Sequence, residues 1–315
     1  RAPSVTLFVL YCKWLMHLKN SIKWSYKPVH LMLNIHSMNI KQGMINFTRV
    51  ISNKIFNKLL WKHLYTDEFI FKLIQKKRKH LWLISAPKSG STWLSTLLNY
   101  SLQWKNVRLV PSLGAREQEA DPRQIIIHGA NTVNTFSPHQ HCRYNSNTAS
   151  VIRQGNIKVV LQLRNIYDTV LSIKDNLDKT KMNFPGTCMD KESWDLLTDE
   201  QRTNFVIDII VPWYFKFFYG WFKSDLLNSG QILVVTYEQL VSNTFKTLNE
   251  ILAFIEEPKM SEQINKAIFK ASLKETKMNK GIIGRGSQLS LEQKRRIIDY
   301  SKYWKNMDFS LLGIE

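Results

Sequence analysis

Residues 81–98 read Leu-Trp-Leu-Ile-Ser-Ala-Pro-Lys-Ser-Gly-Ser-Thr-Trp-Leu-Ser-Thr-Leu-Leu, and they carry the strongest structural signal in the chain. It opens with a short continuous apolar run, residues 81–84, which is typical of a strand covered on both faces of a parallel sheet. A Pro-Lys-Ser-Gly-Ser-Thr loop follows, and leucines then return at helical spacing. The pattern predicts a buried strand, a tight loop and a helix with Ser91 or Thr92 as its N-cap residue.

The loop between that strand and helix is suited to hold an anion. Backbone N–H groups at a helix start have no intrahelical acceptor, and the helix dipole adds positive potential there. Lys88 adds a mobile cation, Gly90 lets the backbone approach closely, and Ser89, Ser91 and Thr92 supply hydroxyl donors. The nucleotide triphosphatase motif places Lys directly after its second Gly, whereas Lys88 precedes Gly90 here. A magnesium ATPase is therefore disfavoured, and an ordinary strand-to-helix turn is the plainer alternative.

A second strand-and-helix pattern repeats this logic. The apolar run at 157–163, Ile-Lys-Val-Val-Leu-Gln-Leu, is followed by Arg164-Asn-Ile-Tyr-Asp-Thr-Val-Leu-Ser172. Arg164 is expected at the carboxyl end of the strand and Ser172 two turns along the next helix, where both could face one phosphate. A guanidinium suits that ligand because it makes two charge-assisted hydrogen bonds to phosphate oxygens. An isolated arginine in this position is more often solvated, so the spacing to Ser172 carries the prediction.

A third candidate lies nearer the carboxyl end, in Asn279-Lys-Gly-Ile-Ile-Gly-Arg-Gly286. Three glycines and two cations in eight residues describe a flexible basic loop that can wrap an anion through its N–H groups. Standing alone, this segment would be interpreted as a solvated glycine turn. Beside two other anion sites it is interpreted as part of the same site.

Together these segments resemble the sulfotransferases that use 3'-phosphoadenosine 5'-phosphosulfate (PAPS). The loop at 87–93 is similar to their phosphosulfate-binding loop, Pro-Lys-Ser-Gly-Thr-Thr-Trp, and differs from it only at Ser91. Arg164 and Ser172, in an Arg-Asn-x-x-Asp context, are similar to the family's 3'-phosphate motif. The resemblance covers about residues 80–315. It implies an α/β, P-loop NTPase-like, three-layer α/β/α fold with a central parallel sheet.

The resemblance also implies residue roles. Lys88 would stabilise the leaving phosphate while a sulfuryl group moves in line to a hydroxyl acceptor. Trp93 would stack on the purine, and Tyr237, which ends the apolar run at 232–236, would contact the adenine. No metal is implied, and PAPS is the co-substrate. The implied nucleotide-binding set is Lys88, Ser89, Gly90, Ser91, Thr92, Trp93, Arg164, Ser172, Tyr237, Asn279, Lys280 and Gly281, with Ser272 as a weaker candidate.

The acceptor hydroxyl needs a base, and the family uses a histidine just past a short strand. Three isoleucines precede His128 at a glycine break, so His128 is the predicted base. His139 and His141 are rivals. The chain lacks the family's cytosolic Lys-x-His-x-Pro pattern around His128, which leaves carboxylates as further alternatives. These carboxylates are Glu117, Glu119 and Asp121.

The two rival histidines could also be interpreted as part of a metal site. His139, His141 and Cys142 lie close together in the sequence, but the second ligand pair of a structural zinc site is missing. The prediction is therefore that no metal is bound.

The net formal charge of +19 is extreme and predicts an anionic ligand. A nucleotide with several phosphates would be such a ligand. Binding to nucleic acid or a membrane surface is the competing explanation of the charge. Because no basic stripe falls on a recognisable nucleic-acid module, no nucleic-acid partner is predicted. The expected partner is a hydroxyl-bearing small molecule or carbohydrate. A nucleotide kinase and a noncatalytic polyanion-binding protein are the alternative functions.

Residues 1–78 are predicted to form a helical, basic extension, and residues 79–315 the sulfotransferase domain. The segment at 69–80 predicts an amphipathic helix with a basic tail, which suits either solvent or a peripheral membrane contact. Three widely spaced cysteines argue against a disulfide framework and favour a cytoplasmic location, with the Golgi lumen as the alternative if an anchor precedes this sequence. The aromatic stripe at 213–222 is interpreted as core, with part of it lining the acceptor pocket.

Overall fold

The computed structural model of the chain describes residues 78–109, 133–180, 189–274 and 282–314. Several predictions lie outside the described residues: nearly all of the extension at 1–78, and His128 with its rivals Glu117, Glu119 and Asp121. The same holds for Asn279, Lys280 and Gly281.

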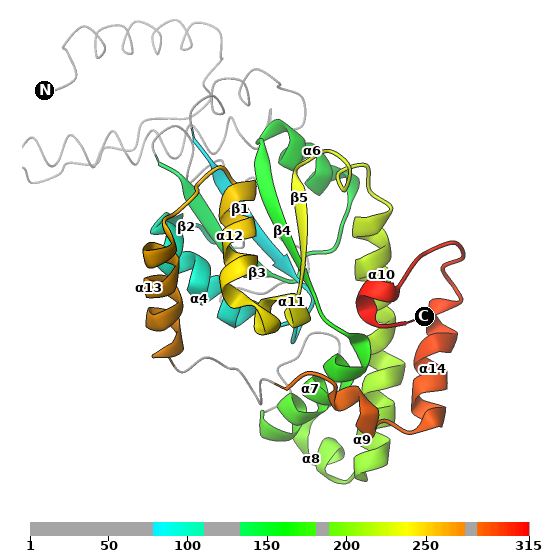
Figure 1. Cartoon of the computed structure of the whole chain (residues 1–315). Helices are drawn as coiled ribbons and strands as arrows, with labels where there is room; N and C mark the ends of the chain where they lie inside the picture. The colour runs from blue at the N-terminus through cyan, green and yellow to red at the C-terminus, as the bar shows by residue number, and fades with distance from the viewer. Residues whose placement is uncertain (1–77, 110–132, 181–188, 275–281, 315) are drawn as a thin grey trace, which may run out of the picture. The chain divides into compact units, whose positions relative to one another are not determined.

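A five-stranded sheet in the order β2-β3-β1-β4-β5 forms the centre of the described structure, and all its neighbouring strands are parallel (Figure 1). The central strands come from the two apolar runs of the sequence, and every residue of β1 is buried, as expected for a strand covered on both faces. The strands are β1 (His80–Ser85), β2 (Lys105–Asn106), β3 (Thr135–Gln140), β4 (Ile157–Leu163) and β5 (Ile232–Thr236).

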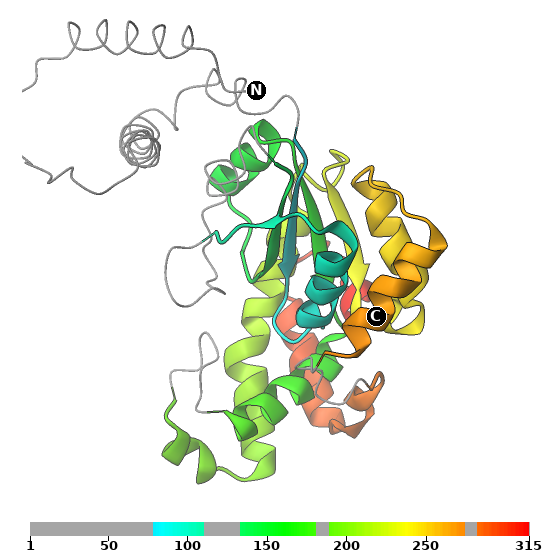
Figure 2. The same ribbon diagram turned by 90° about the vertical axis from the view of Figure 1, so that its left-hand side faces the viewer.

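Helices cover both faces of this sheet, and alternate strand residues contribute to two separate cores. One core holds Leu81 and Leu83 and lies under α4 (Ser91–Leu102), α12 (Thr244–Phe254) and α13 (Ser261–Ser272). The other holds Trp82 and Ile84 and lies under α6 (Ser146–Gln154), α7 (Ile166–Lys179), α10 (Val211–Phe222) and α14 (Leu291–Ser301). Figure 2 shows the two helical layers on either side of the strands. The predicted three-layer α/β/α architecture is confirmed.

The aromatic stripe lies on a long helical run made of α9 (Asp199–Phe205), a π-helical turn η1 (Val206–Ile210) and α10. By length and composition this run could cross a membrane, with a mean hydropathy of 1.2, but half of it is buried. Its inward side packs in the larger core, as predicted for most of the stripe. These buried aromatics are Tyr214, Phe215, Phe217, Phe218 and Trp221.

Short elements complete the described chain. They are α8 (Lys191–Asp195), α11 (Tyr237–Ser242), the 3₁₀ turn η2 (Arg285–Gln288) and the 3₁₀ turn η3 (Ser310–Leu312). Helices α4, α7 and α11 start shortly after β1, β4 and β5 end, so the carboxyl edge of the sheet gathers the starts of three helices. Ligands in open parallel sheets bind at this edge.

Candidate functional site

The loop after β1 presents uncapped backbone N–H groups. The expectation that Ser91 or Thr92 caps the helix is wrong, because Gly90 is the N-cap of α4 and no side chain caps it. Within the described parts of the chain, the N–H groups of Gly90, Ser91 and Thr92 have no hydrogen-bond acceptor. With the helix dipole behind them, these donors are chemically suited to bind an oxyanion.

The backbone of this loop is held in a strained conformation. Lys88 has a φ of 62° and Gly90 a φ of 83°, both in the left-handed region that non-glycine residues rarely adopt. The hydroxyl of buried Ser89 donates to the carbonyl oxygen of Ala86 at 2.6 Å, which closes the loop on itself. A strained backbone of this kind persists only where contacts with the surrounding structure hold it in place. Such conformations concentrate at functional sites.

Helices α7 and α10 each hold this loop through one side-chain hydrogen bond. The Lys88 ammonium donates to Oδ1 of Asn176 on α7 at 3.2 Å. Tyr214 on α10 donates its hydroxyl to the carbonyl oxygen of Pro87. Burial raises the pKa of the Tyr214 phenol well above its ordinary value, so this group stays a protonated donor.

Tyr237 fills the space directly behind Gly90. A β-carbon at position 90 would lie 2.5 Å from Cδ2 of the Tyr237 ring, closer than carbon atoms can approach. The guanidinium of Arg164 also contacts this ring, with its Cζ 4.2 Å from the ring centroid. Burial raises the pKa of the Tyr237 phenol. The structure therefore brings Tyr237 to the loop, where it packs between Gly90 and Arg164.

We expect Gly90→Ala to lower the free energy of unfolding by about 2–4 kcal/mol, because it combines a left-handed backbone with an overpacked contact. Gly230→Ala is the matched control, since Gly230 has a φ of 73° but no heavy atom within 4 Å of an added β-carbon. It should lose only about 1–2 kcal/mol, the cost of the backbone alone. Urea unfolding of the two variants measures the difference. Equal losses would contradict the close contact with Tyr237.

Arg164 connects the three sequence motifs. It lies at the end of β4 and is only 7% exposed. Its Nη1 donates to the carbonyl oxygen of Lys88 at 3.1 Å, and its Nη2 donates to that of Ile282 at 3.2 Å. The buried Nε has no partner in the described residues. Segments 76 and 118 residues away from Arg164 in the sequence therefore meet at one guanidinium.

Asp168 holds the glycine-rich segment in place, a role that the sequence did not reveal. Its two carboxylate oxygens accept the N–H groups of Gly284 at 2.8 Å and Gly286 at 2.6 Å. The same carboxylate lies 3.8 Å from Nη2 of Arg164. Because Gly286 leaves no room for a β-carbon against Tyr167, the segment packs tightly on the first turn of α7. The Asp of the Arg-Asn-x-x-Asp motif, noted only as context for Arg164, was the available signal.

Replacing Asp168 by asparagine should loosen this segment. Asparagine keeps one acceptor but loses the charge and one hydrogen bond, so we expect the free energy of unfolding to fall by about 1.5–3 kcal/mol. Hydrogen exchange at the amides of Gly284 and Gly286 should accelerate. Asp175→Asn is the control, since Asp175 pairs with Arg285 at 2.9 Å from a more exposed position. If only the control accelerated exchange at these amides, the role of Asp168 would be refuted.

A second residue that the sequence did not reveal is Asn165. Its side chain caps α7 by accepting the N–H groups of Tyr167 and Asp168, and its own N–H donates to Glu238 at 3.1 Å. Burial raises the pKa of the Glu238 carboxyl. These contacts fix the start of α7 against α11, and thereby the position of Arg164.

The remaining sequence candidates lie in different surroundings. Ser172 is buried on α7, two turns beyond its start. Trp93 is half-buried and packs with the core under α4 and α13. Ser272 is exposed at the end of α13, where its hydroxyl donates to the carbonyl oxygen of Phe269 at 2.7 Å. The structure does not link Ser272 to the loop.

Two histidines reach the carboxyl edge from β3, the strand beside β1. Nδ1 of His141 lies 2.8 Å from the carbonyl oxygen of Ser85. Ser85 comes just before the loop at 87–92, which we call the anion loop. Because a carbonyl only accepts, Nδ1 carries the proton, and Nε2 is the nitrogen that can take one up. The rings of His139 and His141 are 6.1 Å apart. Among the described residues, no group of three His, Cys, Asp or Glu side chains could hold a metal ion.

Comparison with known proteins agrees with this geometry. The sequence model described as "Sulfotransferase domain" matches residues 78–297, well over half of the chain. A crystal structure of mouse sulfotransferase SULT7A1 complexed with PAP is 16% identical, with a TM-score of 0.54 over 77% of this chain and 91% of that one. A retinol dehydratase in complex with androsterone and the inactive cofactor PAP is 13% identical, with a TM-score of 0.48 over 76% of this chain and 84% of that one. No curated protein sequence matches the chain.

At these identities the solved structures show a shared fold only. The family match covers the anion loop, Arg164 and the segment that Asp168 holds. The chain is therefore a member of the sulfotransferase domain family.

Proposed function

We propose that this protein transfers the sulfuryl group of PAPS to a hydroxyl acceptor by in-line displacement. The observation that carries the proposal is the position of Arg164, which hydrogen bonds both the Lys88 backbone and Ile282. The first two anion-binding motifs and Ile282 of the third thus border one place. A nucleotide that is phosphorylated at both its 5' and 3' ends suits such a paired site.

Each end of the nucleotide has residues suited to bind it. The N–H groups of residues 90–92 and the Lys88 ammonium would hold the 5'-phosphosulfate. Arg164 and Ser172 would hold the 3'-phosphate together with Asn279, Lys280 and Gly281. The uncapped N–H groups and the unpartnered Nε of Arg164 fit a ligand that only accepts hydrogen bonds. Trp93 and Tyr237 would contact the adenine.

In the transfer step, the acceptor oxygen forms a bond to sulfur while the bond between sulfur and the phosphate oxygen breaks. The acceptor proton passes to a base, and the negative charge that develops on the phosphate is stabilised by Lys88. His128 is the base that the sequence predicts. We infer instead that His141 takes this role, since it lies beside the loop and its Nδ1–H is oriented by the Ser85 carbonyl.

Incubation with sulfur-labelled PAPS and a panel of alcohols, phenols, steroids and carbohydrates tests the proposal. We expect label transfer without added magnesium, together with saturable binding of adenosine 3',5'-bisphosphate (PAP) that persists at high salt. ATP turnover that requires magnesium would instead support a nucleotide kinase. If PAP binding disappeared at high salt, the +19 charge alone would explain it, and the protein would be a polyanion binder.

A further inference from the structure

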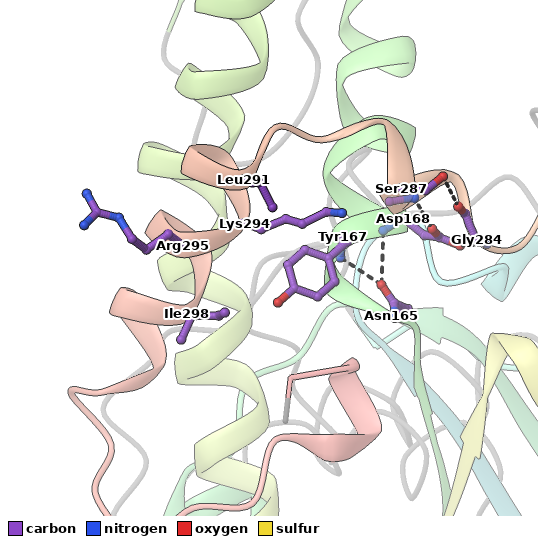
Figure 3. Close-up of a pocket in the computed structure, with 10 residues that line it drawn as sticks. Asn165, Tyr167, Asp168, Gly284, Ser287, Leu291, Lys294, Arg295 and Ile298 are labelled. Carbon is purple, nitrogen blue, oxygen red and sulfur yellow. Dashed lines mark hydrogen bonds between the residues drawn. The ribbon is translucent and has the colours of Figure 1, made fainter.

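A cavity of about 590 Å³ lies between the start of α7, the segment around η2 and the helix α14 (Figure 3). This volume falls in the range of small-molecule sites. Tyr167, Gly284, Ser287, Leu291, Lys294 and Ile298 are among its lining residues. Among the described residues, neither the loop at 87–92 nor Arg164 lines it, so the cavity does not coincide with that part of the proposed nucleotide site.

The walls of the cavity are mainly apolar. The ring of Tyr167 forms one side, and Ile298 and Leu291 from α14 form the other. Leu291 is 86% exposed, so its apolar surface is accessible to a ligand in the cavity. An apolar ligand body lying against these side chains would remove that surface from water.

One cation points into this apolar space. Figure 3 shows the Lys294 side chain extending past the Tyr167 ring toward Ser287. Lys294 is half-buried, and its ammonium has no ion pair within the ranges that the structure describes. The carboxylate of Asp168 also lines the cavity, but among the described residues its ion pair is with Arg164, whose Nη2 lies 3.8 Å away, and not with Lys294.

The neighbouring arginine behaves differently. Arg295 also lines the cavity, but it pairs with Glu292 at 3.2 Å, and Figure 3 shows its guanidinium directed away from the Lys294 ammonium. Of these two cations on α14, Lys294 is therefore the one without an ion pair among the described residues.

We propose that this cavity binds a small amphipathic monoanion, with its carboxylate or sulfate group on Lys294 and its apolar body along Tyr167, Leu291 and Ile298. A half-buried ammonium forms a charge-assisted hydrogen bond with such a group. The ligand would also contact Gly284 and Ser287, which belong to the segment that reaches Arg164 through Ile282. Its binding therefore stabilises that segment and strengthens nucleotide binding, a coupling that rests on the proposed function.

Titration calorimetry with decanoate, and with decanol as its uncharged counterpart, tests the site. We expect decanoate to bind wild-type protein, and Lys294→Met to weaken this binding roughly tenfold or more. Lys302→Met, which removes the same charge at the carboxyl end of the same helix and does not line the cavity, should leave it unchanged. Equal binding to wild type and Lys294→Met, or no binding to wild type, would overturn the site. Decanol binding as tightly as decanoate would show that Lys294 does not select the ligand.

The coupling between the cavity and the nucleotide site is tested by measuring the affinity for each ligand in the presence of the other. Saturating decanoate should raise the affinity for PAP, and PAP should raise the affinity for decanoate by the same factor, because coupling between binding sites is reciprocal. Unchanged affinities would overturn the coupling. Decanoate binding without any PAP binding would instead refute the proposed function and leave the cavity assignment standing.

Discussion

Replacing Lys88 by methionine is expected to lower kcat by roughly 10²–10³-fold, the usual loss when one preorganised charge stabiliser is removed. Methionine keeps most of the apolar stem, so the loop should retain its conformation. The effect arises in the transition state, because the leaving phosphate gains charge only as the bond to sulfur breaks. Single-turnover transfer from labelled PAPS measures the loss directly.

A control variant distinguishes the local role of the Lys88 ammonium from the effect of the protein's overall positive charge. Lys216→Met is the matched control, since Lys216 is exposed on α10 and its replacement lowers the net charge of +19 by the same amount. It should leave kcat unchanged. Affinity for PAP should fall less than kcat in Lys88→Met, and its melting temperature should stay close to that of wild type. Equal losses of kcat in both variants would refute a specific role for Lys88.

The fold could be predicted because its central strands carry a strong local signal. The apolar runs before Lys88 and Arg164 are buried on both faces, and in parallel sheets such strands end at a common edge. Placing Lys88 beside Arg164 followed from that geometry. β3 gave no comparable signal, because Thr135-Phe-Ser-Pro-His-Gln140 holds one large apolar residue. Its strand conformation comes from pairing with β1, which only the tertiary structure supplies.

The supporting residues of the site could not be predicted for a related reason. Asp168 reaches Gly284 across 116 residues, and Lys88 reaches Asn176 across 88. No periodicity or spacing rule specifies such pairs. The N-cap was wrongly assigned to Ser91 or Thr92 because cap statistics favour hydroxyls, whereas the tight contact with Tyr237 requires glycine at position 90. A glycine cap also leaves the N–H groups available to a ligand.

If His141 is the base that accepts the proton of the acceptor hydroxyl, its replacement should strongly lower kcat. His141→Gln should lower kcat by roughly 10²–10⁴-fold, the usual contribution of a general base. Glutamine can still donate its side-chain N–H to the Ser85 carbonyl oxygen, so the support of the loop is retained while the proton acceptor is lost. Binding of PAP should therefore stay near its wild-type value.

Two further variants distinguish the candidates. His139→Gln removes the neighbouring ring, and His128→Ala removes the base that the sequence predicts; each should lower kcat far less than His141→Gln. In wild-type protein, kcat should fall at acidic pH because a protonated imidazole cannot accept the acceptor proton. The residual activity of His141→Gln should lose this dependence, while that of His139→Gln should keep it. A near-wild-type kcat for His141→Gln, with a large loss for His128→Ala, would return the base to His128 and limit His141 to supporting the end of β1.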